Sequence, residues 1–369
     1  MRGAGTTKLA SVRLFLSRNR LTVSILGLGA ALRSLFMLVF RPLTDVYYYD
    51  TEAARALVQG LNPYGHFYGN LPAGILSTPG AGNVFTYLPF TAIFFVPFYL
   101  AGDVRLGLVF ADVVIGASLV WAGYNRSVLA PAFYLLLPFT ILLSTVFLND
   151  TVVAMLFIAL FFVFERRGKG LLGASCFGIA LASIQFSWFV FPFVAYYYLR
   201  GRRWKEPLAI LAVPALIITP YLLANPTAFI YDTLTFQFVR PTMAVVGYFG
   251  PLGYYVNLAL NAFLLTFLHV SLPLSLRVGI VASMLPIFLY KMRGSHRLAL
   301  HSGVFLLVSV FVVSNVFFIS YIELPLVLLL FYAVSARGKR TLKSIRRRGS
   351  LRRFRTTAPH SPKMPVCPI

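Results

Sequence analysis

Long apolar runs separated by short polar or basic stretches make up most of the chain between residues 21 and 335. Many of the runs approach the roughly 20 residues that a helix needs to cross a bilayer, and a soluble core has no need of so many. None alternates with the period of two that marks membrane β-strands. The pattern therefore predicts an all-α, polytopic transmembrane bundle of roughly 9–12 membrane helices, short and re-entrant ones included. The predicted membrane segments are residues 21–40, 84–101, 105–122, 128–147, 151–164, 171–199, 207–223, 251–269, 275–290, 297–314 and 316–335.

Some of these runs are expected to be irregular. Residues 128–147 contain Pro131 and Pro138, which break a helix. Residues 171–199 have basic residues at both ends, so they should cross the membrane twice or not at all, yet they are too short for two full crossings. We expect two short helices that meet near Ser183–Trp188. The same reasoning predicts a re-entrant pair at 128–147 and a partial crossing at one of 251–269 and 275–290.

The charge distribution predicts the topology. The net charge is +23, but the basic residues lie in the termini and in short loops, which is the positive-inside distribution of a membrane protein rather than a nucleic-acid-binding face. We expect a multi-pass plasma-membrane protein with both termini cytoplasmic, a membrane domain over 1–335 and a disordered basic tail over 336–369 that lies near anionic lipid headgroups. The basic loops expected inside are 165–169, 200–205 and 291–297, and the polar segments expected outside are 41–83 and 224–250.

Several polar residues from distant parts of the chain would then lie at the outer face. Asn149, Asp150, Gln185 and Glu323 all lie near predicted outer ends. Irregular backbone at membrane depth is tolerated only where it lines a protein or water cavity. The sequence therefore predicts an outward-facing polar cavity walled by short helices.

The first outer segment contains a candidate base. Asp45 lies just past the first apolar run, and residues 49–58 can form an amphipathic helix that Asp50 or Thr51 caps and Gly60 ends. A carboxylate at this boundary can accept a proton from an incoming hydroxyl. The alternative is that Asp45 is only an interfacial acid or a helix cap.

The order of several short motifs resembles a known family. After Asp45 come an aromatic run, an Ala-Ala-x-Ala-Leu sequence and a Gly-x-Asn-Pro-Tyr turn, and the further motifs are Tyr87-Leu88-Pro89, Asn149-Asp150, Glu165-Arg166-Arg167 and the Gly173/Gly178 pair. Over about residues 20–200 this order is similar to that of GT-C-fold membrane glycosyltransferases, in the mannosyltransferase-like branch that uses polyprenyl-phosphate sugars. The chain departs from the family at Gln185, where such proteins often carry a lysine.

The resemblance implies an activity and a set of partners. A hexose, with mannose the expected sugar, would move from a polyprenyl-phosphate donor to a hydroxyl of a glycan or lipid acceptor at the outer face. Asp45 would be the general base, and inversion of the anomeric centre would follow from a single base without a nucleophile. The retained phosphate leaves as a stable anion, so neither a metal nor a cofactor is expected.

Other residues of the outer segments are candidates for substrate binding. Asp50 and Glu52 can orient sugar or acceptor hydroxyls. His66 can contact the sugar or the donor headgroup, or it can pack the loop. Tyr64 can touch substrate, but its place in Asn62-Pro63-Tyr64 favours a role in fixing the shape of the loop. Asp150 can face the same cavity or cap the helix that follows it, and its position before an apolar run favours the cap.

Five further polar side chains are candidates, four of them within or beside predicted spans and Arg240 in the second outer segment. Gln185 offers a phosphate only neutral hydrogen bonds, so Arg240 is the candidate for the charged contact, unless it anchors the chain at the interface. Glu323 near the outer end of the last span is a candidate cavity residue. Arg33 and Asp112 are costly in lipid and are expected to pair across two helices.

Two other functions fit a polytopic chain. A transporter or lipid-linked-sugar flippase would also have broken helices and buried ionisable groups, with its acids at the midplane and often an internal repeat. Here the acids cluster after the first span and no repeat is evident, which favours the enzyme. A non-catalytic scaffold would tolerate loss of Asp45. Sequence patterns of nucleotide hydrolysis or metalloprotease chemistry are absent.

Overall fold

The computed structural model of the chain is built from helices. Wherever it is described, the backbone forms no β-strand. The described residues are 19–66, 68, 71–72, 75, 84–122, 128–239, 257–292, 295–315 and 317–335. The predicted 336–369 tail lies outside them.

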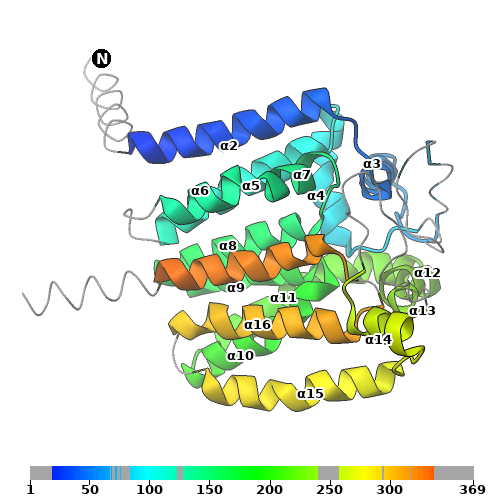
Figure 1. Cartoon of the computed structure of the whole chain (residues 1–369), viewed down its shortest axis with the longest axis vertical. Coiled ribbons are helices and arrows are strands. Elements are labelled where there is room, and N and C mark those ends of the chain that lie inside the picture. Colours follow the sequence, from blue (N-terminus) through cyan, green and yellow to red (C-terminus); the bar gives the residue numbers. More distant parts are fainter. Residues whose placement is uncertain are drawn as a thin grey trace, which may run out of the picture.

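The helices form one bundle with roughly parallel axes (Figure 1). The longer helices are α2 (Arg20–Val39), α5 (Arg105–Ala122), α8 (Thr151–Arg166), α11 (Lys205–Ala224), α15 (Leu274–Lys291) and α16 (Ser295–Val313). The shorter ones are α3 (Asp45–Val58), α4 (Pro89–Leu100), α6 (Leu129–Leu136), α7 (Pro138–Thr145), α9 (Gly170–Leu181), α10 (Phe191–Arg200), α12 (Pro226–Ile230), α13 (Phe236–Val239) and α14 (Leu260–Leu268). Single turns of 3-10 or π-helix are η1 (Gln185–Phe189), η2 (Tyr231–Thr235) and η3 (Ile319–Ile322), and a last helix covers 323–335.

Four of the described helices, α2, α5, α11 and α15, are long and apolar enough to cross a membrane. Only 11% of the most apolar window of α2, of α11 and of α15 is buried within the protein, whereas 67% of that of α5 is buried. An apolar helix with so little protein around it needs an apolar surrounding. The structure therefore indicates a membrane protein in which α5 is central and the other three helices form outer faces.

The broken segment at 128–147 crosses the bundle instead of turning back. Pro138 is the first residue of α7, and the preceding Leu137 is extended (φ −67°, ψ 120°), as a residue before proline prefers. This confirms the predicted break. The re-entrant arrangement was wrong, because α6 and α7 follow one another along α2 and α5 (Figure 1).

The predicted span at 84–101 does not form a crossing helix. The helix begins only at Pro89, so α4 rises about 18 Å, and it lies across one end of the bundle (Figure 1). The backbone N–H groups of Leu88 and Phe90 donate to the carbonyls of Ser183 and Ala182 at 3.1 and 3.0 Å. These bonds fix the start of α4 to the turn after α9.

Residues 171–199 form the two short helices that were predicted. α9 and α10 are joined by η1, which contains the expected junction near Ser183–Trp188. The hydroxyl of Ser187 donates to the Ala180 carbonyl at 2.7 Å, which closes the turn tightly.

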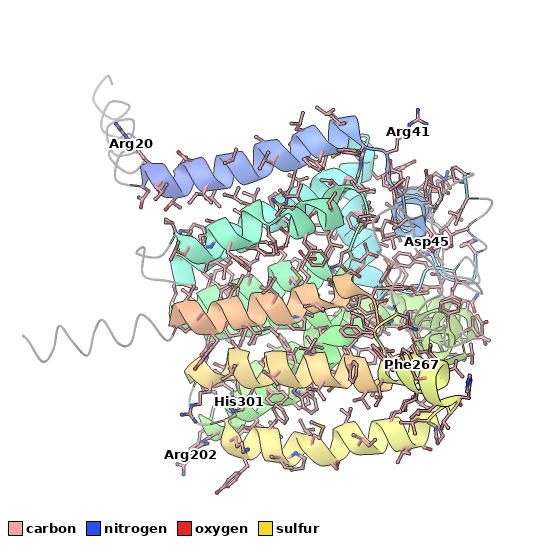
Figure 2. All side chains as sticks on the ribbon, in the orientation of Figure 1. Arg20, Arg41, Asp45, Arg202, Phe267 and His301 are labelled. Atoms are coloured by element: carbon pink, nitrogen blue, oxygen red, sulfur yellow. The ribbon has the colours of Figure 1, made fainter. Side chains whose placement is uncertain are left out.

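Charged residues divide the bundle into two ends. Arg20, Arg202 and His301 lie at one end, which we name the basic end, and Asp45 lies with α3 and α14 at the other (Figure 2). At the basic end Arg203 forms ion pairs with Glu165 and Glu206. The termini of the described chain, residues 19 and 335, also lie at the basic end (Figure 1).

The core contains the predicted ion pair between two helices. Arg33 Nε lies 2.6 Å from Asp112 Oδ2, and both side chains are fully buried. Arg33 also donates to the Leu135 carbonyl at 2.6 Å and to the Thr140 hydroxyl at 3.1 Å. The Tyr134 hydroxyl donates to Asp112 at 2.5 Å. An ion pair with its remaining hydrogen bonds satisfied joins α2, α5 and α6 at little net cost in folding free energy. Removal of one partner would leave a buried unpaired charge and destabilise the protein.

Candidate functional site

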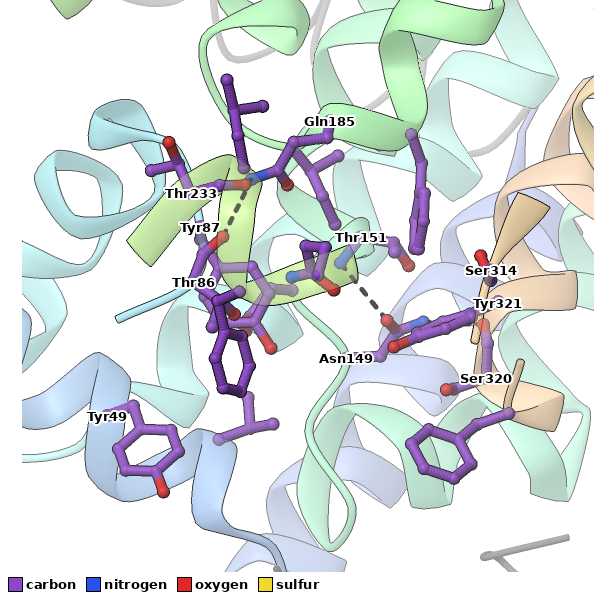
Figure 3. Close-up of a pocket in the computed structure, with 18 of the residues that line it drawn as sticks. Tyr49, Thr86, Tyr87, Asn149, Thr151, Gln185, Thr233, Ser314, Ser320 and Tyr321 are labelled. Carbon is purple, nitrogen blue, oxygen red and sulfur yellow. Dashed lines mark hydrogen bonds between the residues drawn. The ribbon is translucent and has the colours of Figure 1, made fainter. Parts of the chain in front are cut away.

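A cavity of about 360 Å³ opens at the end of the bundle that carries Asp45. We call this end the cavity end. The volume of the cavity is within the roughly 300–1,000 Å³ that is typical of small-molecule binding sites. The predicted polar cavity walled by short helices is thus present, with α3, η1, α13 and η3 among its walls (Figure 3). The residues that line it and enter the argument below are Asp45, Tyr49, Thr86, Tyr87, Leu148, Asn149, Asp150, Gln185, Phe186, Trp188, Phe236, Phe238, Val313, Ser314, Ser320 and Tyr321.

Asp45 lies in the cavity wall as the first residue of α3. The preceding Thr44 is buried and its hydroxyl donates to the Phe147 carbonyl at 2.8 Å, which holds the start of the helix against the turn before α8. A helix N-terminus favours a carboxylate. The half-buried Asp45 carboxyl is therefore held at the cavity surface, where it can accept a hydrogen bond.

The helix around Asp45 begins earlier than its sequence pattern predicted. The expected helix was 49–58 with a cap at Asp50 or Thr51, but α3 starts at Asp45, and Thr51 donates instead to the Tyr47 carbonyl at 2.7 Å. The predicted cap was wrong because an additional turn precedes it. The end is as expected: α3 stops at Val58, and Gly60 adopts φ +73°.

Asp50 and Asp150 form a buried carboxyl pair at the cavity wall, which Asp150 itself lines. Asp50 is inaccessible to solvent, Asp150 nearly so, and no well-formed hydrogen bond reaches either carboxylate from a donor in the described residues. The two groups face each other with the Tyr87 phenol beside Asp150. Burial raises the pKa of Asp150 to about 6. Burial and the nearby charge of Asp150 raise the pKa of Asp50 well above its usual range. Both shifts favour the protonated form of the pair.

A strained turn positions Asn149 and Asp150. Leu148 has φ +36° although it is not glycine, and its side chain is buried. Asn149 Nδ2 donates to Glu323 at 2.7 Å, and its Oδ1 accepts from the Thr151 N–H at 3.3 Å. The bonds of Asn149 tie the start of α8 to the last helix.

The expected capping role of Asp150 is not observed. α8 does start at Thr151, as predicted, but Asp150 makes no side-chain cap hydrogen bond. Its backbone is already helical (φ −65°, ψ −13°), whereas a capping residue is typically extended. Its carboxyl therefore points into the pair with Asp50 and the cavity, which was the alternative role.

Gln185 reaches the cavity, but its amide donors are already used. The Nε2 atom donates to the Thr86 carbonyl at 2.9 Å and to the Thr233 carbonyl at 2.7 Å. Figure 3 shows this side chain between the two segments. Gln185 thus ties η1 to the start of α4 and to η2.

Other predicted site residues of the first segment lie away from the cavity. Glu52 pairs with Arg55 at 2.8 Å on the exposed side of α3. Tyr64 is buried in a separate apolar cluster, and its hydroxyl donates to the Tyr87 carbonyl at 2.8 Å. His66 is exposed on the loop. For Tyr64 this corresponds to the loop-shaping role that was left open.

Two predicted residues remain. Glu323 is fully buried, accepts from the wall residue Asn149 and lies 3.4 Å from the Tyr134 hydroxyl, but it does not itself line the cavity. Arg240 lies outside the described residues.

The sequence interpretation missed the aromatic part of the wall. Phe186, Trp188, Phe236 and Phe238 all line the cavity. The last two come from the segment that was interpreted as a polar outer loop, where their apolar character was the available signal.

Metal binding has no support in the described structure. Among its residues no group of three or more His, Cys, Asp or Glu side chains is arranged to hold an ion.

No protein-family model, curated protein or solved structure matches the chain.

Proposed function

We propose that this chain is a membrane glycosyltransferase that moves a hexose, mannose being the expected sugar, from a polyprenyl-phosphate carrier to a glycan or lipid hydroxyl at the outer face. The observation that carries the proposal is the position of Asp45 in the wall of a cavity at the end of an apolar bundle opposite the basic loops. The order of motifs around Asp45 in the first segment supports the same activity.

The proposed step needs one base and a stable leaving group. The acceptor oxygen forms a bond to the anomeric carbon while the bond from that carbon to the phosphate oxygen breaks. The bonding electrons leave with the polyprenyl phosphate, and the hydroxyl proton passes to Asp45. Attack opposite the leaving group inverts the anomeric centre.

The mixed lining of the cavity suits a donor that is part sugar and part lipid. Asp45, Asn149 and Thr86 offer polar groups, whereas Phe186 and Phe238 offer apolar surface. Trp188 is 41% exposed and Phe238 is 46% exposed, although both line the cavity. A sugar could lie at the polar side while its carrier continues towards lipid past these two rings.

The basic end would face the cytoplasm, and the cavity would open outward. Positive loops stay inside, and Arg20 and Arg202 share one end. Under this orientation both termini are cytoplasmic in the plasma membrane, and the acceptor is a glycan or lipid outside the cell.

Sugar transfer by purified chain tests the proposal. A labelled polyprenyl-phosphate hexose is given to wild type, to Asp45→Asn and to Glu52→Gln. Loss of a general base predicts a fall in rate of about 10²–10⁴-fold for Asp45→Asn. Glu52→Gln is the matched control, since it removes an exposed carboxylate of the same helix. Unchanged transfer by Asp45→Asn would refute its role as base, and no transfer by wild type from any such donor would refute the class.

A transporter or lipid-linked-sugar flippase is the second candidate. The observation in its favour is the buried set of Arg33, Asp112 and Glu323, joined through the Tyr134 hydroxyl, because ionisable groups inside a membrane bundle often serve transport. Reconstituted vesicles distinguish the two. A flippase moves the labelled carrier across the membrane with its sugar still attached, and Asp45→Asn leaves that movement intact.

A further inference from the structure

Arg277 is a buried cation near the cavity that the proposed reaction does not yet use. It lies in the first turn of α15, and only 5% of the residue is exposed. Its Nη1 donates to the Val313 carbonyl at 2.7 Å, whereas its Nε is buried without a partner. An arginine that merely reached for lipid headgroups would expose its guanidinium instead.

The chain supplies no acidic side chain to neutralise Arg277. All ten Asp and Glu residues fall within the described ranges, and none forms an ion pair with it. Five of them pair with other arginines: Glu52, Asp103, Asp112, Glu165 and Glu206. Asp232 accepts from the Gly65 N–H and Glu323 from Asn149. The remaining three, Asp45, Asp50 and Asp150, are grouped around the cavity wall and its carboxyl pair.

An uncompensated guanidinium is an unstable arrangement in a low-dielectric bundle. Arginine does not lose its proton in proteins, and a buried charge is expensive unless it is paired. The carbonyl at the end of α16 supplies only the partial negative charge of a helix C-terminus. A bound anion would supply the missing counter-charge, and the planar fork of donors suits a phosphate.

The position of Arg277 connects this charge to the cavity. Val313, whose carbonyl it binds, and the following Ser314 both line the cavity. Gln185, the residue at the position where a charged phosphate contact was expected, uses its amide donors on two backbone carbonyls. We infer that Arg277 is the phosphate-binding residue of this cavity. The assignment of that phosphate to a polyprenyl carrier rests on the proposed function.

Binding of a short isoprenoid phosphate to the purified full chain tests this inference. Farnesyl phosphate, uncharged farnesol and phosphatidylglycerol are titrated in an uncharged maltoside detergent, and affinity and thermal stabilisation are measured. Wild type should be stabilised by farnesyl phosphate and not by farnesol. Arg277→Gln should weaken the phosphate affinity roughly tenfold to a hundredfold, as expected for a charge-assisted contact. Arg41→Gln is the control, because it removes an exposed charge at the same end.

The outcomes separate the possible roles of Arg277. Unchanged farnesyl phosphate affinity in Arg277→Gln would overturn the inference. If that variant does not fold, wild type still decides, since equal stabilisation by farnesol and farnesyl phosphate would also overturn it. If phosphatidylglycerol binds as tightly and loses as much affinity in the variant, the phosphate site stands but its assignment to the sugar carrier is overturned.

Transfer assays keep this inference separate from the proposed function. Arg277-dependent binding without any sugar transfer by wild type would support the phosphate site and refute the proposed enzyme activity. If wild type transfers sugar and Arg277→Gln shows the same transfer rate and the same binding, the enzyme activity is supported and the role of Arg277 is refuted.

Discussion

The carboxyl pair of Asp50 and Asp150 makes one junction of the molecule sensitive to pH. Asp50 comes from α3 and Asp150 from the start of α8, so the pair joins the helix that carries Asp45 to the bundle. Tyr87 and Asp45 are the other titratable groups that act on it. A shared proton holds the two groups together, and full ionisation sets two buried charges against each other.

The raised pKa values determine the direction of the pH effect. An acid whose pKa is higher in the folded state than in the unfolded state stabilises the fold when it is protonated. This contribution is complete below the ordinary pKa of 3.8 and is lost as pH rises through the folded pKa, which is about 6 for Asp150 and also raised for Asp50. The pair should therefore lower the stability of the protein between about pH 4 and pH 7.

Replacing Asp50 by asparagine should remove this loss. The amide cannot ionise and can donate to Asp150, so Asp50→Asn should raise the free energy of unfolding at pH 7 by on the order of 1–3 kcal/mol. At pH 4 the gain should vanish. Thermal unfolding in detergent across this pH range measures the difference. Glu52→Gln, an exposed carboxylate of the same helix, should show no such trend. A variant that is less stable than wild type at pH 7 would contradict the shared proton.

Single residues were predictable where their local sequence determines their place. Asp45 follows the first apolar run directly, so its position at the bundle end could be expected. Asp50 was expected to face a ligand but faces Asp150, 100 positions further along, which no local pattern encodes. Arg277 was missed for the same reason. Whether an arginine finds an acid depends on the whole three-dimensional arrangement.

At the scale of elements, close packing between α9 and α11 depends on one glycine. A Cβ atom at Gly178 would lie 2.8 Å from the Val213 Cβ and 3.0 Å from the Ile210 carbonyl oxygen. The second neighbour is backbone and cannot rotate away. The short helix α9 is thus held against α11 by a direct backbone approach, as small residues allow in membrane bundles.

Gly178→Ala should separate these two helices. The clash should destabilise the protein by about 1–3 kcal/mol, measured as a lower thermal midpoint. Gly27→Ala is the matched control. Gly27 is also in an apolar helix, but a Cβ atom added there would have no neighbouring atom within 4 Å, so the variant gains helix propensity without a clash. Equal stability of the two variants would mean that α9 and α11 are not closely packed.

The elements that the sequence predicted well are those that a proline or flanking basic residues delimit. Pro138 predicted the break between α6 and α7, and the basic ends of 171–199 predicted a pair of short helices. Hydropathy could not tell that α4 lies across the bundle, because a short apolar helix looks the same whether it crosses or covers an end. Assigning the crossing to residues 84–101 then forced the wrong re-entrant assignment on 128–147.

For the whole molecule, the division into a basic end and a cavity end is the feature that relates fold to function. The Arg203 cluster with Glu165 and Glu206 is at the basic end, and the cavity is at the other. Donor and acceptor can meet outside the cell only if the cavity end is external. The direction of insertion is therefore a condition that the proposed function has to satisfy.

Cysteine labelling tests that direction. In a background with Cys176→Ser and Cys367→Ser, Leu61→Cys is placed beside α3 at the cavity end and Arg202→Cys at the basic end, both at exposed positions. A maleimide that does not cross membranes should label position 61 in intact cells and position 202 only after permeabilisation, because positive loops stay inside. The reverse pattern would place Asp45 and Arg277 on the cytoplasmic side. Transfer at the outer face would then be impossible, even if both residues bind and react as proposed.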